Sequence, residues 1–287
     1  MKALFRRLLS PPRSLLSRLG GRVARGTTCE EAWIELPKSR RVYCHIHRPA
    51  AAGKHPGVVF VPGGISPGTD YDTAGELTAN DVAAAGSVVL HYDPAGRGRT
   101  GGEEDRWGPA HQEELAHVVR HFAALPGLET SGVGIVSFSI GITIAAGALA
   151  QYALPVRYLF DWEGPSNRRN ITLNGTFAPL RDYPVTDDTF WEQREAARFI
   201  GRIACGYFRY QAERDHVQGG YKGHALELLN LATRGKAAWT RCNDNPPNTL
   251  FEGDRADSCR WVPEGMNTTG RILEYLRGVQ AFVQDHR

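Results

Sequence analysis

Short apolar runs alternate with longer amphipathic stretches from about residue 30 onward. The runs have the length of strands and lie at residues 42–47, 57–61, 87–92, 133–138, 156–162, 207–211 and 238–241. Helical spacing of apolar residues is clear at Leu115, Val118, Val119 and Phe122, and again at Ile272, Leu276, Val279 and Val283. Strands that alternate with helices are typical of α/β folds, because each helix returns the chain to start a parallel strand. The pattern therefore predicts an α/β fold, with a mostly parallel sheet and helices on both faces.

The chain has 287 residues, of which 41% are hydrophobic, and this suits one domain with a sizeable core. A polar stretch interrupts the alternation after residue 166, and an amphipathic helix is expected to follow it. The apolar residues of that helix are Phe190, Trp191, Ala197, Phe199 and Ile200. We expect a basic extension at residues 1–29 and one α/β domain at residues 30–287, with a lid insertion at about 166–206 over the strand ends.

Positive charge is concentrated at the N-terminus, where residues 1–25 hold seven basic and no acidic residues. Subtracting those seven from 34 leaves 27 basic against 31 acidic residues, and no basic face with interleaved aromatic residues stands out, so nucleic-acid binding is not expected. The segment lacks the unbroken apolar core of a secretion signal, and no run has the roughly 18 apolar residues of a membrane span. We expect a cytoplasmic protein. A frayed N-terminal tail is favoured over a weak contact of this segment with a membrane surface.

The five cysteines form no CxxC motif and cannot all pair, which is typical of a reducing compartment. A disulfide between Cys242 and Cys259 stays open as an alternative. The oligomeric state is not predicted.

The segment Ser137-Phe138-Ser139-Ile140-Gly141 joins an apolar strand to a stretch of small residues that predicts a helix. A nucleophilic serine on so sharp a turn has strained backbone dihedrals, so its neighbours two positions away must be small, as Ser137 and Gly141 are. A serine that only caps a helix needs neither feature. We interpret Ser139 as a nucleophile, with the positive end of the following helix directed at an oxyanion.

An earlier strand ends in Pro62-Gly63-Gly64, where two glycines allow the backbone to approach a substrate closely. In acyl transfer, the amides of Gly63 and Gly64 would donate hydrogen bonds to the tetrahedral oxyanion together with the amide of Ile140. This interpretation depends on Ser139, because Pro-Gly-Gly alone indicates only a turn.

Residues 42–165 resemble the dienelactone-hydrolase and prolyl-oligopeptidase-like branch of the α/β-hydrolase superfamily. The resemblance rests on residues 42–49, 55–64 and 93–102 and on the turn at Ser139, in that order and at that spacing. It implies an α/β-hydrolase fold and a triad in the order Ser, Asp, His. The strand and turn at residues 207–218 resemble the segment that carries the acid, so the resemblance places the acid at Asp215.

The sequence departs from this family at the histidine. After the last expected strand the chain continues Cys242-Asn243-Asp244-Asn245, and the only later histidine is His286, next to the C-terminus. Three explanations compete. In the first, a histidine from another loop reaches Ser139, since a triad is defined by geometry rather than by sequence position; His216 is favoured over His224.

In the second explanation, the acid comes from Asp161 or Glu163 after the preceding strand, although either residue equally well orients the lid or pairs with a nearby arginine. The third explanation is loss of activity, which would leave a binding protein that uses the same pocket. Keeping small residues on both sides of Ser139 argues against such loss.

Two further sequence patterns are weaker indicators of function. His45 and His47 lie on one face of a strand, which suits a metal, but the sequence shows no third ligand, so we expect an ordinary surface strand and no metal. The glycine-rich turn at residues 93–98 lacks the Gly-Lys-Ser/Thr of a phosphate-binding loop. No cofactor is expected.

We therefore expect a carboxylic ester hydrolase that acts on a small-molecule ester, with Ser139 as nucleophile, His216 as base and Asp215 as acid. Phe190, Trp191 and Phe199 suggest a partly apolar substrate. An amidase or peptidase of the same branch is the alternative enzyme. The length of 287 residues leaves no room for an N-terminal propeller, which favours small esters.

Overall fold

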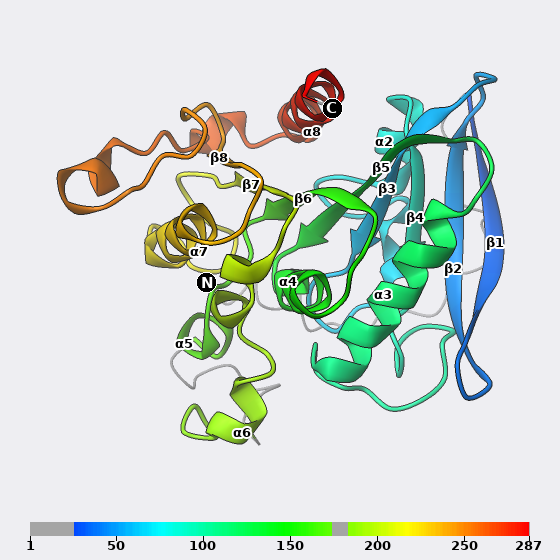
Figure 1. Ribbon diagram of the computed structural model, residues 1–287, viewed down its shortest axis with the longest axis horizontal. Helices are drawn as coiled ribbons and strands as arrows, with labels where there is room; N and C mark the ends of the chain where they lie inside the picture. The colour runs from blue at the N-terminus through cyan, green and yellow to red at the C-terminus, as the bar shows by residue number, and fades with distance from the viewer. Residues whose placement is uncertain (1–25, 174–182, 287) are drawn as a thin grey trace.

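The computed structural model describes residues 26–173 and 183–286, and these residues form one sheet covered by helices on both faces (Figure 1). The sheet has eight strands in the order β1-β2-β4-β3-β5-β6-β7-β8. β1 pairs antiparallel with β2, and β2 with β4, while every other pair is parallel. The strands are β1 (Thr27–Leu36), β2 (Arg40–Pro49), β3 (His55–Val61), β4 (Val88–Tyr92), β5 (Leu128–Phe138), β6 (Val156–Trp162), β7 (Gly206–Tyr210) and β8 (Thr240–Cys242).

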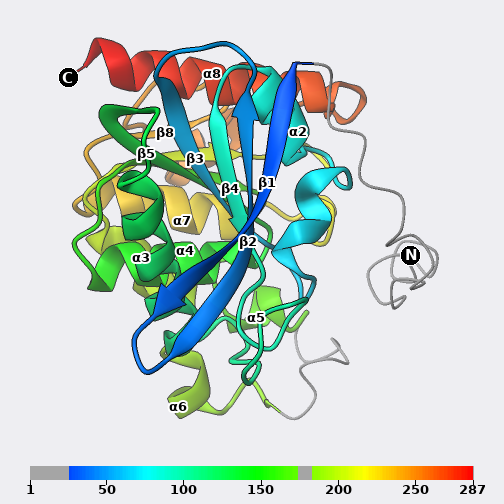
Figure 2. The same cartoon turned by 90° about the vertical axis from the view of Figure 1, so that its right-hand side faces the viewer.

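The helices divide between the two faces of the sheet. Their bounds are α2 (Ala79–Ala84), α3 (Pro109–Ala123), α4 (Gly141–Gln151), α5 (Arg168–Ile171), α6 (Asp188–Trp191), α7 (Gly223–Arg234) and α8 (Thr269–Asp285), with short 3-10 helices η1 (Gly68–Asp72), η3 (Ala196–Arg198), η4 (Ile200–Arg202), η5 (Gly253–Ser258) and η6 (Glu264–Met266). Figure 2 shows α3, α4 and α7 on one side of the sheet and α2 and α8 on the other.

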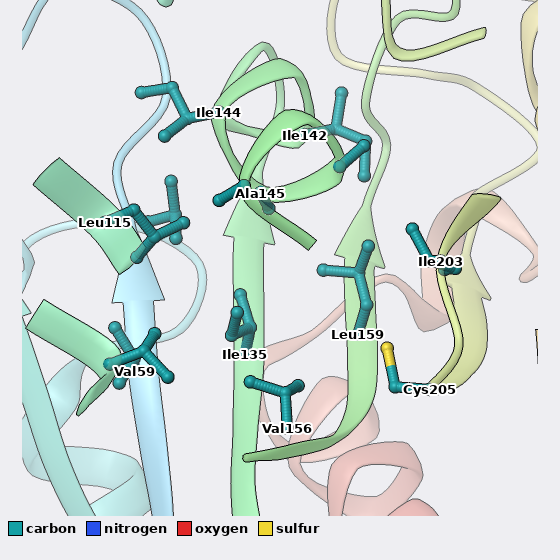
Figure 3. Packing of buried hydrophobic residues seen from close by; sticks show 14 of the residues in the cluster. Val59, Leu115, Ile135, Ile142, Ile144, Ala145, Val156, Leu159, Ile203 and Cys205 are labelled. Atoms are coloured by element: carbon teal, nitrogen blue, oxygen red, sulfur yellow. The ribbon is translucent and has the colours of Figure 1, made fainter. Parts of the chain in front are cut away.

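Two apolar clusters lie on the two faces because side chains alternate along each strand. Val59, Ile135 and Leu159 point toward Leu115 of α3 and Ala145 of α4 (Figure 3). Strand residues of opposite parity, such as Val58, Val136 and Phe160, pack with α2 and α8. All of these side chains are buried. The strands that are buried on both faces are those with continuous apolar runs in the sequence, as expected for parallel strands covered by helices.

The predicted α/β fold with a mostly parallel sheet is confirmed. Six of the seven expected strands agree with the structure to within a few residues, and the seventh, β8, begins two residues later than predicted. The sequence pattern did not indicate β1, which is an edge strand with exposed residues Thr28–Glu31. An edge strand pairs through its backbone and needs little apolar surface. β1 already begins at Thr27, within the stretch expected to be an extension, and residues 1–25 lie outside the described residues.

The amphipathic helix expected through Phe190 and Ile200 is not continuous, and this prediction is wrong. The segment instead consists of α6, η3 and η4. The break lies at Glu195, whose backbone is extended at φ −106° and ψ 118°. Its carboxylate accepts hydrogen bonds from the backbone and the guanidinium of Arg168, and these contacts bind Glu195 to the start of α5.

Among the described residues, no helix is long and apolar enough to cross a membrane. Cys242 and Cys259 are both buried and are free thiols in the structure, so the alternative of a disulfide between them is not realised.

Candidate active site

Ser139 lies on the turn between β5 and α4, where the strand passes directly into the helix. Its φ of 50° is the strained left-handed conformation that the sequence motif requires. Two glycines allow the end of β3 to touch this turn. A Cβ on Gly63 would lie 2.7 Å from the carbonyl oxygen of Phe138, and one on Gly141 would lie 2.7 Å from the carbonyl oxygen of Pro62.

His216 is the histidine that reaches Ser139. Its Nε2 lies 2.9 Å from Ser139 Oγ, which is a hydrogen-bond distance. His216 follows β7, and its ring packs against Trp162 at the end of β6, with centroids 4.5 Å apart. The side chain is 21% exposed, so one edge of the imidazole is open. Of the two histidines that the sequence left open, the structure brings His216 to Ser139.

Glu163 occupies the other side of this imidazole. Its Oε2 lies 2.8 Å from His216 Nδ1 and also accepts from the backbone N–H of His216 at 3.1 Å, while its Oε1 accepts from the N–H of Ala212 at 3.0 Å. The carboxylate is thus held at the turn after β7 by three hydrogen bonds. The φ of Glu163 is 51°, so a second strained residue lies beside Ser139 at the end of the neighbouring strand.

The charges around His216 alter its pKa. Burial alone would lower it, but the hydrogen bond that His216 donates to Glu163 and the charges of Asp215 and Glu163 outweigh burial and raise the pKa above its ordinary value. The imidazolium that forms when His216 takes a proton is therefore stabilised. Ser139, His216 and Glu163 have the connectivity of nucleophile, base and orienting carboxylate.

Asp215, which the sequence assigned as the acid, lies farther from the imidazole. Its Oδ1 is 3.6 Å from His216 Nδ1 and instead accepts from the backbone N–H groups of Val217 and Gln218, each at 2.7 Å. Asp215 therefore shapes the turn that carries His216, whereas Glu163 contacts the ring. The geometry favours Glu163 over Asp215 as the orienting acid, because a carboxylate bonded to its own turn is not aligned with a neighbouring side chain.

The remaining candidates have other partners. His224 Nε2 lies 3.1 Å from Asp215 Oδ2 and has no contact with Ser139 among the described interactions. Asp161 forms a fully buried ion pair with Arg209 at 2.6 Å and accepts from the hydroxyl of Tyr207 at 2.8 Å. Of the acids that the sequence left open after β6, Glu163 is the one that faces His216.

The predicted oxyanion hole is only partly open. The N–H of Gly63 donates to the hydroxyl oxygen of Tyr71 at 3.2 Å, so it is already engaged. The carbonyl of Gly64 is held by Arg97 Nη1 at 3.0 Å and by Trp107 Nε1 at 2.8 Å, which fixes the glycine turn. Tyr71 keeps its own hydroxyl proton and can donate it. Sequence patterns did not indicate Tyr71, which lies in η1 with no recognisable motif.

Asn243 follows β8, at the position where the sequence resemblance places a histidine. Its side chain accepts from the N–H of Gln211 and donates to the carbonyl oxygens of Gln211 and Arg260. Asn243 thus connects the end of β7 to a later loop. The residue at the expected histidine position is structural, and the imidazole comes from the neighbouring strand.

The aromatic residues expected to contact a substrate do not share one role. Trp191 is fully buried with its Nε1 bonded to the carbonyl of Pro184, and Phe199 is also buried. Phe190 stacks on Tyr183 with ring centroids 4.0 Å apart. These rings stabilise the segment itself. A cavity of about 250 Å³ lies along α8 beside Phe208 and Trp239, and Ser139 does not line it.

Solved structures share this fold. A puromycin-hydrolysing peptidase of Mycobacterium tuberculosis matches with a TM-score of 0.64 at 17% identity over 90% of this chain, which spans 39% of that protein. Acetyl xylan esterase 1 of Thermoanaerobacterium sp. matches with a TM-score of 0.58 at 15% identity, over 89% of this chain and 86% of the esterase. An esterase of Pyrococcus furiosus matches with a TM-score of 0.58 at 13% identity, over 75% and 80% of the two chains.

No protein-family model and no curated protein sequence matches the chain. At identities this low, the structural matches establish the fold.

Proposed function

Because the chain has the α/β-hydrolase fold, we propose that it is a serine hydrolase that cleaves carboxylic esters through an acyl-enzyme on Ser139. One observation carries the proposal. His216 Nε2 lies 2.9 Å from Ser139 Oγ while His216 Nδ1 lies 2.8 Å from Glu163 Oε2. A serine on a strained strand-to-helix turn needs no such pair of contacts for capping, whereas nucleophilic catalysis needs both.

The proposed mechanism follows from these contacts. Ser139 Oγ attacks the ester carbonyl as its proton passes to His216 Nε2, and Glu163 stabilises the imidazolium. The amide of Ile140 and the hydroxyl of Tyr71 donate to the oxyanion, while the N–H of Gly63 donates to the Tyr71 oxygen and so holds that hydroxyl in place. His216 then gives the proton to the leaving alkoxide. A water molecule, deprotonated by His216, attacks the acyl-enzyme and releases the acid and Ser139.

Both esterases and peptidases are among the matched proteins. The two esterases are covered over 86% and 80% of their lengths, whereas this chain spans 39% of the puromycin-hydrolysing peptidase and 41% of an acylaminoacyl peptidase. Cleavage of an amide or a peptide is the second candidate, since the peptidase matches have slightly higher TM-scores of 0.64 and 0.60.

Matched chromogenic substrates test the proposal. We expect the purified protein to hydrolyse p-nitrophenyl acetate and butyrate, and to cleave the corresponding p-nitroanilides more slowly. The Ser139→Ala variant is expected to lose about 10⁶-fold in kcat, as serine hydrolases do without their nucleophile. Replacement of the exposed Ser258 by Ala is the control and should leave the rate unchanged.

Faster cleavage of the anilides than of the esters would overturn the ester assignment. Equal ester hydrolysis by the wild-type protein and by Ser139→Ala would overturn the assignment of the nucleophile.

A further inference from the structure

Three histidines converge on one carboxylate at the antiparallel side of the sheet, away from Ser139. His45 and His47 of β2 and His91 of β4 direct ring nitrogens at Asp72, the last residue of η1. The distances to the Asp72 oxygens are 2.8 Å from His45 Nδ1, 2.6 Å from His47 Nε2 and 2.9 Å from His91 Nε2. The thiol of Cys29 adjoins the cluster, with Sγ 3.4 Å from His47 Nε2.

The sheet register brings these residues together. His45 lies opposite His91 in the β2–β4 pair, and Cys29 lies opposite His47 in the β1–β2 pair. Directly opposite residues share a face of the sheet, so the side chains form one row. The sequence showed His45 and His47 but no third ligand, because the other two come from β4 and η1. The reason for expecting no metal here is thereby removed.

His91 cannot donate a hydrogen bond to Asp72 as a neutral ring. Its Nδ1 lies 2.9 Å from the carbonyl oxygen of Gly68, which accepts only, so Nδ1 carries the proton. Nε2 then presents a lone pair to the carboxylate. Consistent with this, Nε2 of His91 is buried and lacks a hydrogen-bond partner among the described residues, although it lies 2.9 Å from Asp72 Oδ1.

His45 likewise cannot donate a hydrogen bond to Asp72 while its ring is neutral. Its Nε2 lies 2.8 Å from the hydroxyl of Tyr43, and that hydroxyl donates to Glu31 Oε2 at 2.5 Å. The Tyr43 oxygen is therefore an acceptor for His45, and the ring proton is on Nε2. Nδ1 of His45 then also directs a lone pair at Asp72, at 2.8 Å.

Two lone pairs facing a carboxylate repel it unless a cation lies between them. Protonation of His45 and His91 would also remove the repulsion, but it would place two positive charges on rings whose centroids are 5.4 Å apart. His91 is fully buried, and burying a charge is costly. A metal ion resolves the conflict with both rings neutral. The Nδ1–H of His91 donates to the carbonyl oxygen of Gly68, which is a contact typical of metal-binding imidazoles.

We propose that His45 Nδ1, His47 Nε2, His91 Nε2 and the Asp72 carboxylate bind a zinc ion. Three imidazoles and one carboxylate are a donor set that zinc accepts, with bonds of about 2.0–2.2 Å and tetrahedral geometry. Ligand atoms around such an ion lie roughly 3.3 Å apart, so the present contacts need to open by about half an ångström. Four protein ligands leave no open position, which is typical of a structural site.

The site has a structural consequence for the active site. Asp72 ends the same 3-10 helix that carries Tyr71, whose hydroxyl accepts from the N–H of Gly63. Zinc at Asp72 would fix η1 to β2 and β4, and through Tyr71 it would fix the glycine turn beside Ser139. The zinc proposal itself does not depend on hydrolase activity.

Metal binding to the full chain tests the proposal. After dialysis against EDTA and removal of the chelator, titration with Zn²⁺ alone is followed by calorimetry, and retained metal is counted by mass spectrometry. We expect one zinc per chain and a higher melting temperature with zinc. Asp72→Asn and His91→Asn should each weaken binding by at least about 100-fold. Circular dichroism shows whether these variants are folded.

Two control variants distinguish the loss of a zinc ligand from other effects of substitution. His121→Ala removes an exposed imidazole outside the cluster and should bind zinc as the wild type does. Cys29→Ser should also retain zinc, since the thiol is not among the four proposed ligands. Absence of stoichiometric zinc in the wild type, equal affinity in folded Asp72→Asn, or loss of zinc in Cys29→Ser would overturn the proposal.

Discussion

The imidazole of His216 has its tautomer set by its two neighbours. The Glu163 carboxylate accepts hydrogen bonds, so Nδ1 carries a proton and Nε2 presents a lone pair to the hydroxyl of Ser139. This is the form that a general base requires. Glu163 is fixed in turn by the N–H groups of Ala212 and His216, so the ring orientation does not depend on a mobile side chain.

Glu163→Gln tests the orienting role. The amide can donate to His216 Nδ1 and so favours the wrong tautomer, and a comparable exchange in a serine protease lowers kcat about 10⁴-fold. We expect a loss of about that size in ester hydrolysis, with Ser139 still in place. Exchange of the exposed Glu192 for Gln is the control. A loss of less than about tenfold in Glu163→Gln would place the orienting acid elsewhere.

The raised pKa of His216 predicts the direction of the pH profile. A general base acts when unprotonated, so kcat/KM should rise with pH through an inflection above the ordinary histidine value of about 6.5. Asp215→Asn removes one of the charges that raise this pKa, so its inflection should move to lower pH. An unmoved inflection in Asp215→Asn would show that this carboxylate does not act on the ring.

Tyr71→Phe distinguishes two roles of the hydroxyl beside Gly63. If the hydroxyl donates to the oxyanion, its loss should lower kcat by about 10²-fold or more with little change in KM. If it only occupies the N–H of Gly63, its removal should leave kcat unchanged or raise it. We expect the first result, measured as separate kcat and KM values for p-nitrophenyl acetate.

At the scale of elements, the turns after β6 and β7 carry Glu163 and His216, the proposed acid and base. Asp161 and Glu163 are two residues apart, yet the structure separates their roles. Asp161 bonds to Arg209 and to the N–H of Gly164, which holds the turn after β6, while Glu163 turns out toward His216. Parallel neighbours end at one edge of the sheet, which is why residues distant in sequence meet there.

The Asp161–Arg209 pair is expected to be important for stability. Both side chains are fully buried, so Asp161→Ala leaves an unpaired buried guanidinium and should lower the free energy of unfolding by about 3–5 kcal/mol. Urea denaturation measures this change. Glu252→Gln breaks the half-exposed pair with Arg234 and should cost less than about 1 kcal/mol. Similar losses in both variants would contradict this view of the buried pair.

Whether an element was predictable from the sequence depended on the interactions that hold it in place. Strands buried on both faces and helices with one apolar face leave periodic patterns, so β3 to β7, α3 and α8 were visible. β1 is held by backbone pairing at an edge and leaves little apolar pattern. The segment around Glu195 follows an ion pair with Arg168 that no local spacing encodes.

At the scale of the whole molecule, the turn at Ser139 is encoded in the local sequence, whereas the contacts that Ser139 makes with distant residues are not. The turn at Ser139 is local, since its strained φ, its small neighbours and the start of the helix lie within five residues, and the sequence predicted this turn. The pairing of His216 with Glu163 depends on β6 and β7 being adjacent, which only the assembled sheet establishes. The prediction of Asp215 rests on a resemblance in which the acid, and not the histidine, follows this strand.

The histidine after β7 is the feature that most needs an experiment, because Asn243 fills the position after β8. The central claim is that His216 activates Ser139. A fluorophosphonate probe labels only an activated serine, so the wild-type protein should be labelled at Ser139, whereas Ser139→Ala should remain unlabelled and His216→Ala should react at least about 10³-fold more slowly. Labelling of His216→Ala at the wild-type rate, or no labelling of the folded wild-type protein, would contradict the claim.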